Sequence, residues 1–308
     1  MYRYPIIHRI PIHPFIERKG DFMYPYDIVF GVGLYEICIV IGLILAMVVF
    51  RILADRARLS ARVQNMCLVA FPVALALGYL SAVVFQWFYN GIRDGKFAES
   101  IFAASTGATF YGGLIGGTAM FIVIYLIAGH FLFKDKYHLA HLRTASDIAP
   151  ACITVAHGFG RLGCLMAGCC YGAKCDAWYG IKMVHLGYKV VPVQLFEAIF
   201  LLGLSILFLL AFKKGKKYLM PAYMMSYAVW RFIAEILRND YRGATIVDFL
   251  TPSQFISVLL LAGGLLLLGI ELYVDGKKAK AAVAEGEAPA EAVETVETAE
   301  TTEGEAHE

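Results

Sequence analysis

Seven long apolar runs dominate this 308-residue sequence, and no other feature limits its possible folds so strongly. Each run holds roughly 20 residues or more, the length at which an α-helix crosses the hydrocarbon core of a bilayer. Because 59% of the residues are hydrophobic and only 17% are charged, a soluble globular domain is excluded. We therefore expect an all-α polytopic membrane protein with seven transmembrane helices. The runs span 28–50, 65–88, 103–133, 146–168, 192–212, 219–237 and 253–274.

The loops between these runs differ in their basic residues, and this difference predicts the orientation of the chain. The first, third and fifth loops hold 11 Lys and Arg, against 7 in the longer second, fourth and sixth loops. Since Lys and Arg favour the cytoplasmic side of a membrane, we expect the N-terminus outside and the C-terminus in the cytoplasm.

The composition divides the chain into three parts. Residues 1–27 are aromatic, charged and rich in proline, which is typical of an interfacial segment. Residues 28–275 hold the seven apolar runs and form the expected transmembrane domain. Residues 276–308 include nine Glu after position 280, and we expect them to be a disordered acidic tail.

Polar side chains within the apolar runs are costly in a bilayer and therefore indicate function. In the predicted orientation, five of the runs carry such residues to one depth near the outer surface. An Arg suits a phosphate because its planar fork bonds two oxygens at once and stays charged. The pattern predicts a pocket for a phospholipid headgroup, although a structural clamp is the alternative for Arg231 and Glu235. The residues at this depth are Tyr35, Tyr111, Gly112, Gly113, His157, Arg161, Gln194, Glu197, Arg231, Glu235 and Arg238.

Four cysteines lie close together at and just beyond the outer end of the fourth run: Cys164, Cys169, Cys170 and Cys175. Their C-x4-C-C-x4-C spacing differs from the paired C-x2-C of zinc sites, so we expect no metal. A disulfide is favoured because this loop is predicted to face the outside, and free reactive thiols are the alternative. The nearby G-x-G-x-x-G match at 158–163 follows no strand, so we expect no dinucleotide and no other cofactor.

In register along most of residues 28–274, the sequence resembles the bacterial prolipoprotein diacylglyceryl transferases. The similar segments are F-Y-G-G-L-I-G at 110–116, S-D-I-A-P at 146–150, G-R-L-G-C at 160–164, P-V-Q-L-F-E at 192–197 and W-R-F-I-A-E-I-L-R at 230–238. Tyr111 stands where that family has a His, while Cys164 and Cys169 stand where its signature has Asn and Glu. The chain is most similar to a divergent branch with the signature G-C-x-x-A-G-C-C-Y-G.

The resemblance implies a multi-pass protein of the bacterial plasma (inner) membrane. It implies transfer of the diacylglyceryl group from phosphatidylglycerol to the lipobox cysteine of prolipoproteins. The implied partners are phosphatidylglycerol, the prolipoprotein lipobox peptide and membrane lipids, and no nucleic acid is expected.

The resemblance also implies roles for individual residues. Arg161 and Arg231 would hold the lipid phosphate. Apart from the resemblance, His157 is the only His that we place in the membrane at this depth, so it is the first candidate for the base that takes the thiol proton, and Tyr111 is the second. Tyr35, Gly112, Gly113, Gln194, Glu197, Glu235 and Arg238 would line or support the pocket. Two alternatives remain: a different lipid transferase with Cys169 or Cys170 as covalent nucleophile, and a non-catalytic homologue that binds lipid or lipoprotein.

Overall fold

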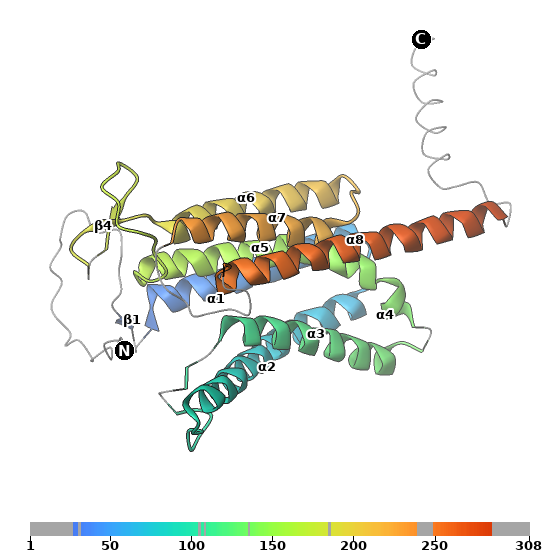
Figure 1. Cartoon of the computed structure of the whole chain (residues 1–308). Coiled ribbons are helices and arrows are strands. Elements are labelled where there is room, and N and C mark those ends of the chain that lie inside the picture. The colour runs from blue at the N-terminus through green and yellow to red at the C-terminus, as the bar shows by residue number, and fades with distance from the viewer. Residues whose placement is uncertain are drawn as a thin grey trace, which may run out of the picture.

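A computed structural model describes residues 27–29, 32–103, 106–107, 109–134, 136–183, 186–238 and 249–284. The side chains of 27–29, 93, 110, 111 and 282–284 lie outside this description. Long helices form most of the fold (Figure 1). The helices are α1 Leu34–Arg56, α2 Ala61–Asp94, α3 Phe110–Leu132, α4 Tyr137–Ala140, α5 Leu142–Met166, α6 Val193–Lys213, α7 Leu219–Ile236 and α8 Pro252–Ala284.

Each of the seven apolar runs coincides with one long helix, but several bounds differ from those predicted. Residues 28–33 do not begin the first helix, because β1 (Asp27–Val29) and β2 (Val32–Gly33) pair there as an antiparallel ribbon. The α1 helix starts only after Gly33, whose backbone N–H donates to Glu36 Oε2 at 2.9 Å. Such a bond satisfies one amide that the first helical turn leaves unpaired.

The third and the last runs also differ from expectation. The α3 helix starts at Phe110, seven residues later than predicted. The α8 helix continues to Ala284, past position 276, where we expected the acidic tail to begin. The remainder of that tail lies outside the described residues, as does the interfacial segment 1–26.

Within the described part of the chain, six helices are long and apolar enough to cross a membrane: α1, α2, α3, α5, α6 and α8. The α7 helix, with 18 residues, is not among them. It carries both Arg231 and Glu235, which lower its mean hydropathy. These charges are buried, so α7 turns its charged face toward its neighbours, while apolar Val229 and Ile233 are exposed.

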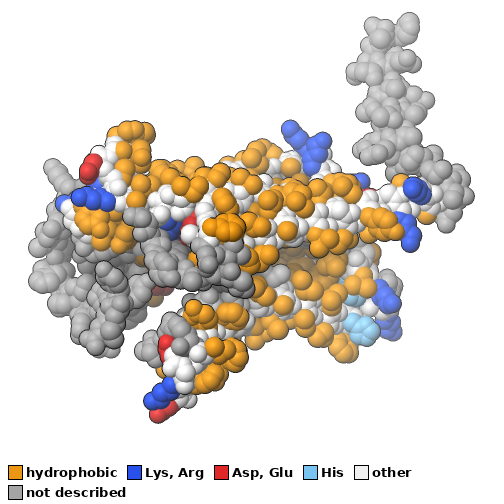
Figure 2. All heavy atoms as spheres, viewed as in Figure 1, with side chains coloured by type: hydrophobic (Ala, Val, Ile, Leu, Met, Phe, Trp, Pro, Cys, Tyr) orange, Lys and Arg blue, Asp and Glu red, His pale blue; other side chains and the backbone are white. Residues whose placement is uncertain are grey.

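The helices form two groups. In Figure 1, α1, α5, α6, α7 and α8 lie together as a bundle, while α2 and α3 pack on each other and diverge from it. Buried Leu53, Ile148 and Phe208 join α1, α5 and α6 into one core. Hydrophobic side chains cover the outer face of the long helices, as a bilayer requires (Figure 2).

Glycine allows the closest helix contact, between α2 and α3. A Cβ atom on Gly78 would lie 2.9 Å from the Cα of Gly117 and 3.0 Å from the carbonyl oxygen of Gly113. Because both obstacles are backbone atoms, a larger residue would push the two helices apart. Small residues at helix interfaces are typical of membrane bundles.

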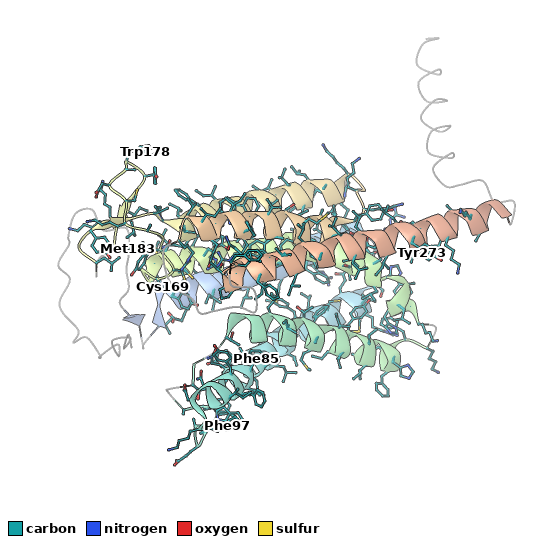
Figure 3. The ribbon with its side chains drawn as sticks, in the orientation of Figure 1. Phe85, Phe97, Cys169, Trp178, Met183 and Tyr273 are labelled. Carbon is teal, nitrogen blue, oxygen red and sulfur yellow. The ribbon has the colours of Figure 1, made fainter. Side chains whose placement is uncertain are left out.

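A short hairpin follows α5 at one end of the bundle. Its strands are β3 (Ile181–Lys182) and β4 (Lys189–Val190), and they pair antiparallel. The loop before the hairpin contains the cysteine cluster, and Figure 3 labels Cys169 where α5 ends and α1 begins.

Candidate functional site

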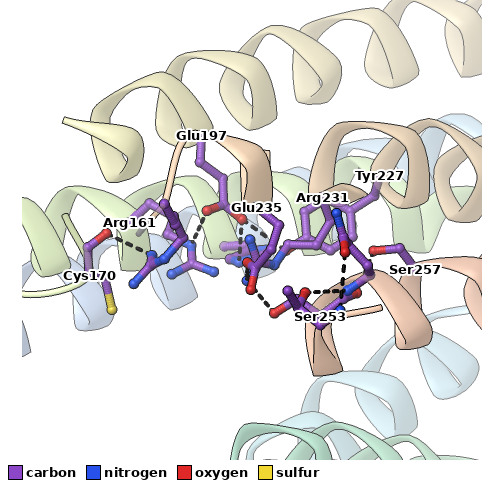
Figure 4. Close-up of polar contacts among 12 residues, drawn as sticks. Arg161, Cys170, Glu197, Tyr227, Arg231, Glu235, Ser253 and Ser257 are labelled. Atoms are coloured by element: carbon purple, nitrogen blue, oxygen red, sulfur yellow. Dashed lines mark hydrogen bonds and ion pairs between the residues drawn. The ribbon is translucent and has the colours of Figure 1, made fainter. Parts of the chain in front are cut away.

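Glu197 lies at the centre of a polar cluster that joins three helices of the bundle (Figure 4). Its side chain is 1% exposed and stands in the second turn of α6. Arg161 of α5 places its Nε 2.9 Å from Glu197 Oε2, and the Tyr227 hydroxyl of α7 donates to Glu197 Oε1 at 2.9 Å. His157, one turn before Arg161, places its Nε2 3.9 Å from the same Oε1. This single carboxylate therefore positions side chains from both neighbouring helices.

A second arginine–glutamate pair lies on α7. Arg231 Nη2 is 2.8 Å from Glu235 Oε2 and donates to Ser253 Oγ of α8 at 2.7 Å. Ser257 in turn donates to the Ser253 carbonyl oxygen at 2.8 Å. The i,i+4 spacing of Arg231 and Glu235 puts both on one face of α7, as predicted. Arg231 also ties α7 to α8 through Ser253, which is the contact that a structural clamp requires.

The two arginines surround the same pair of side chains. Both guanidinium groups interact electrostatically with the Tyr227 hydroxyl and with the His157 ring. The two rings pack edge to face, with centroids 5.2 Å apart. Arg161 and Arg231, from α5 and α7, thus reach one shared region of the bundle.

Two side chains in this region retain unused hydrogen-bonding atoms. Arg231 Nη1 and both amide atoms of Gln194 are buried without a hydrogen-bond partner among the described residues. Gln194 precedes Glu197 by one turn of α6 and is 1% exposed. Buried polar atoms are rarely left unpaired, so these atoms indicate room for a polar ligand.

An apolar hollow of about 230 Å³ lies between α7 and α8 beside the second pair. Ser257, which contacts Ser253, is also part of its wall. The hollow and the Arg231–Ser253 bond therefore lie along the same interface between α7 and α8. Its lining residues are Ala228, Val229, Phe232, Ile233, Ser257, Val258 and Leu261.

The cysteines at the end of α5 and in the loop after it form a tight cluster of three, not four. The Sγ atoms of Cys164, Cys169 and Cys170 all lie within 4.8 Å of one another, whereas Cys175 is outside this group. All seven cysteines, every one within the described residues, are free thiols, so the predicted disulfide is wrong for this structure. The prediction rested on the expected outside location of the loop, whereas in the structure the three sulfur atoms approach one another without forming a bond.

Arg238 connects this cluster to α7. Its Nη1 donates to the Cys170 carbonyl oxygen at 2.8 Å. The pKa of Cys170 is lowered, first by the thiol hydrogen bonds from Cys164 and Cys169 and then by Arg161 and Arg238. The first turn of α1 packs against the last turn of α5 beside the cluster, since a Cβ on Gly163 would lie 3.0 Å from the Tyr35 carbonyl oxygen.

Among the described residues, no hydrogen bond or ion pair joins α3 to the polar cluster around Glu197. A Cβ on Gly112 would lie 2.9 Å from Phe85 Cβ, and one on Gly113 would lie 3.4 Å from Ala82 Cβ. These two glycines therefore pack α3 against α2. The Tyr111 side chain lies outside the described residues.

Sequence reasoning missed two residues of the cluster. Tyr227 holds Glu197, and Ser253 holds Arg231. Tyr227 precedes Arg231 by four residues, so the same helical spacing that paired Arg231 with Glu235 could have found it. The Ser253 contact depends on how α8 meets α7, and no local pattern reports that.

A bundle of long apolar helices with two arginine–glutamate pairs between them is the structure of a multi-pass membrane protein with a polar site inside it. Comparison with known proteins then identifies the family. The family model for prolipoprotein diacylglyceryl transferase matches residues 26–270, so the chain belongs to that family.

Similar proteins from several bacteria agree with this assignment. The phosphatidylglycerol–prolipoprotein diacylglyceryl transferase 2 of Clostridium perfringens is 39% identical over 171 residues, which are 53% of this chain and 62% of that relative. The phosphatidylglycerol–prolipoprotein diacylglyceryl transferase of Clostridioides difficile is 30% identical over 243 residues, which are 77% of this chain and 90% of that relative. The Streptococcus sanguinis one is 29% identical over 80% of this chain and 92% of its own length. The chain thus spans less than two thirds of the first relative and about nine tenths of the others.

Proposed function

We propose that this protein transfers the diacylglyceryl group of phosphatidylglycerol to the cysteine thiol of a prolipoprotein lipobox. The family match and the names of the relatives support this activity. The observation that carries the proposal is a chain of contacts between the two arginines. Arg161 pairs with Glu197, Glu197 accepts a hydrogen bond from Tyr227, and Arg231 follows Tyr227 by one turn of α7.

In the proposed reaction the lipid phosphate binds between the two guanidinium groups. The substrate sulfur attacks the glycerol carbon that carries the phosphate, so an S–C bond forms and a C–O bond breaks. Negative charge then develops on the departing glycerol phosphate, and fixed cations stabilise such charge most strongly in a site without bulk water. Arg231 Nη1 is buried and unpaired among the described residues, so it offers the phosphate a donor. His157 and Tyr111 stay the candidates for accepting the thiol proton.

The remaining predicted pocket residues act around this phosphate. Glu197 and Glu235 hold the two arginines in place and keep the empty site close to neutral. Gln194, whose amide is buried without a hydrogen-bond partner in the described structure, binds the glycerol hydroxyls of the headgroup. Tyr35 and Arg238 border the cysteine cluster and form the entrance for the peptide.

The apolar hollow between α7 and α8 accommodates an acyl chain of the same lipid. Its wall contains Ser257, which hydrogen-bonds to Ser253, the partner of Arg231. A phosphate at Arg231 therefore places the attached glycerol at the mouth of the hollow. Apolar lining side chains suit a hydrocarbon chain because each buried methylene group contributes about 0.8 kcal/mol.

The membrane arrangement we propose has seven spans in the bacterial plasma membrane, with the N-terminus outside. At 1.5 Å per residue the 18 residues of α7 reach about 27 Å, close to the hydrocarbon thickness of a bilayer. At the bundle end opposite the cysteines, a hollow of about 340 Å³ is lined by Arg56, Lys213, Lys216 and Lys217. Basic side chains favour the cytoplasmic side, so the cysteine end faces outward.

The test is a transfer assay with the purified full-length protein in phosphatidylglycerol vesicles. A lipobox peptide with Cys is expected to gain one diacylglyceryl group, whereas the matched Ser peptide stays unmodified. Arg161→Ala and Arg231→Ala are each expected to lower the rate at least 100-fold, and Arg51→Ala, at an exposed surface pair, is expected to leave it unchanged. Full activity in both pocket variants would remove the phosphate role.

A further inference from the structure

The three thiols of Cys164, Cys169 and Cys170 are brought together by a specific turn. The Cys169 backbone N–H donates to the Cys164 carbonyl oxygen at 3.1 Å, which closes the turn over the end of α5. Cys170 then adopts a backbone φ of 62°, in the left-handed region that residues other than Gly and Asn adopt only with strain. The strained residue is the one that completes the cluster of thiols.

The spacing of the three sulfur atoms suits one tetrahedral metal ion. A zinc ion bound to thiolates at about 2.3 Å places neighbouring sulfurs about 3.8 Å apart. The three Sγ atoms already lie within 4.8 Å of one another. Each sulfur–sulfur distance therefore has to shorten by no more than about 1 Å to reach that geometry, which side-chain rotation can provide. The sequence spacing argued against zinc only because it differs from the familiar C-x2-C pair.

The surroundings favour a negatively charged metal–thiolate group. Zinc with three thiolates carries one net negative charge. Arg161 interacts electrostatically with Cys164 and Cys170, and Arg238 binds the Cys170 carbonyl oxygen at 2.8 Å. These two cations compensate the charge without occupying a position on the metal.

Three protein ligands leave the fourth tetrahedral position open, which is the pattern of catalytic zinc sites. Arg161 belongs both to the surroundings of the thiols and to the Glu197 cluster. A group bound at the open position is therefore next to the region in which we place the lipid phosphate. A soft fourth ligand, a thiolate, is the group that a zinc ion with three thiolates accepts readily.

We propose that Cys164, Cys169 and Cys170 bind a zinc ion whose open position takes the sulfur of the substrate cysteine. This inference rests on the proposed function, and it deepens it by assigning how the thiol is activated. The substrate S–H loses its proton as the sulfur binds the metal, because a coordinated thiol is deprotonated. The proton passes to the base, for which His157 and Tyr111 are the candidates. The zinc-bound sulfur then forms the bond to the glycerol carbon, the C–O bond breaks, and glycerol phosphate leaves with the electron pair. Zinc keeps its oxidation state throughout.

The first test is the metal content of the full-length protein, purified in detergent under reducing conditions without chelators. We expect one zinc per chain by elemental mass spectrometry. Cys164→Ser, Cys169→Ser and Cys170→Ser are each expected to lose it, while Cys175→Ser, from the same loop but outside the cluster, keeps it. Size-exclusion chromatography of each variant shows whether it remains folded. Protein without zinc that also binds none when Zn²⁺ is added would overturn the inference.

The second test needs no variant and examines the open position. Replacement of zinc by Co²⁺ is expected to give the thiolate-to-cobalt absorption of a tetrahedral site. A lipobox peptide with Cys is expected to shift the visible bands, and the Ser peptide is not. A cobalt spectrum that both peptides leave unchanged would contradict the assigned role of the fourth position.

The two proposals fail in different ways. Undiminished transfer by protein whose zinc has been removed would overturn the metal inference and leave the proposed function intact. A lipid adduct on Cys169 or Cys170, detected in the intact mass of the protein, would also overturn the metal inference, because it would show a covalent intermediate on the enzyme. Bound zinc and a thiol-dependent cobalt spectrum without any transfer to the peptide would support the site and contradict the proposed function.

Discussion

Glu197 offers the sharpest test of how the polar cluster is held together. Its buried carboxylate pairs with Arg161 and accepts a hydrogen bond from Tyr227. Glu197→Gln keeps an oxygen for the Tyr227 hydroxyl but leaves the Arg161 guanidinium without its counterion. Breaking one partner of a buried ion pair costs about 3–5 kcal/mol. The Arg161 side chain is 16% exposed, so we expect the lower end, about 3 kcal/mol.

The measurement is thermal unfolding of the full-length protein in detergent. A loss of about 3 kcal/mol lowers the Tm by roughly 5 °C in a chain of this size. Adding Arg161→Met to Glu197→Gln removes the unpaired charge, and we expect it to recover part of the lost Tm. Glu36→Gln is the matched control, because Glu36 is exposed and only caps α1. If Glu197→Gln were as stable as Glu36→Gln, or the second substitution lowered the Tm further, the reasoning would be refuted.

Three further predictions concern the fold. Gly78→Ala presses a methyl group onto the backbone of α3 and is expected to cost about 1–3 kcal/mol, whereas Gly269→Ala, with nothing within 4 Å, is expected to be neutral in the same unfolding assay. Asp147 accepts a 2.8 Å bond from the first backbone N–H of α7, so Asp147→Ala is expected to cost about 1–2 kcal/mol and Asp147→Asn less. The Tyr218 hydroxyl donates to Asp275, and this bond raises the pKa of Tyr218. Its stabilising contribution is present below about pH 10 and is lost as the pH rises through the raised pKa, so the stability gap to Tyr218→Phe is expected to close in alkali; a constant gap would contradict the assignment.

The long helices were predictable from the sequence because each apolar run satisfies its own backbone hydrogen bonds. The faces of those helices followed from the 3.6-residue period, which placed Arg231 with Glu235 and Gln194 with Glu197. Helix ends were harder, since residues before Leu34 are apolar but form a ribbon that pairs β1 with β2. Hydropathy alone does not distinguish an apolar strand from the first turns of a helix.

The features of the site that the sequence did not predict are contacts between segments far apart in the chain. The Arg161–Glu197 pair and the Arg231–Ser253 bond depend on how α5, α6, α7 and α8 meet. The cysteine cluster shows the same limit on a local scale. Its geometry follows from the left-handed conformation of Cys170, which the spacing of the cysteines does not reveal.

The central claim is that guanidinium groups from α5 and α7 bind one lipid phosphate. A structure of the full-length protein with phosphatidylglycerol, determined by cryo-electron microscopy, measures this directly. We predict headgroup phosphate oxygens within about 3.2 Å of nitrogens of both Arg161 and Arg231, with an acyl chain between α7 and α8. A bound headgroup elsewhere in the bundle, with both arginines contacting only their glutamates, would contradict the account.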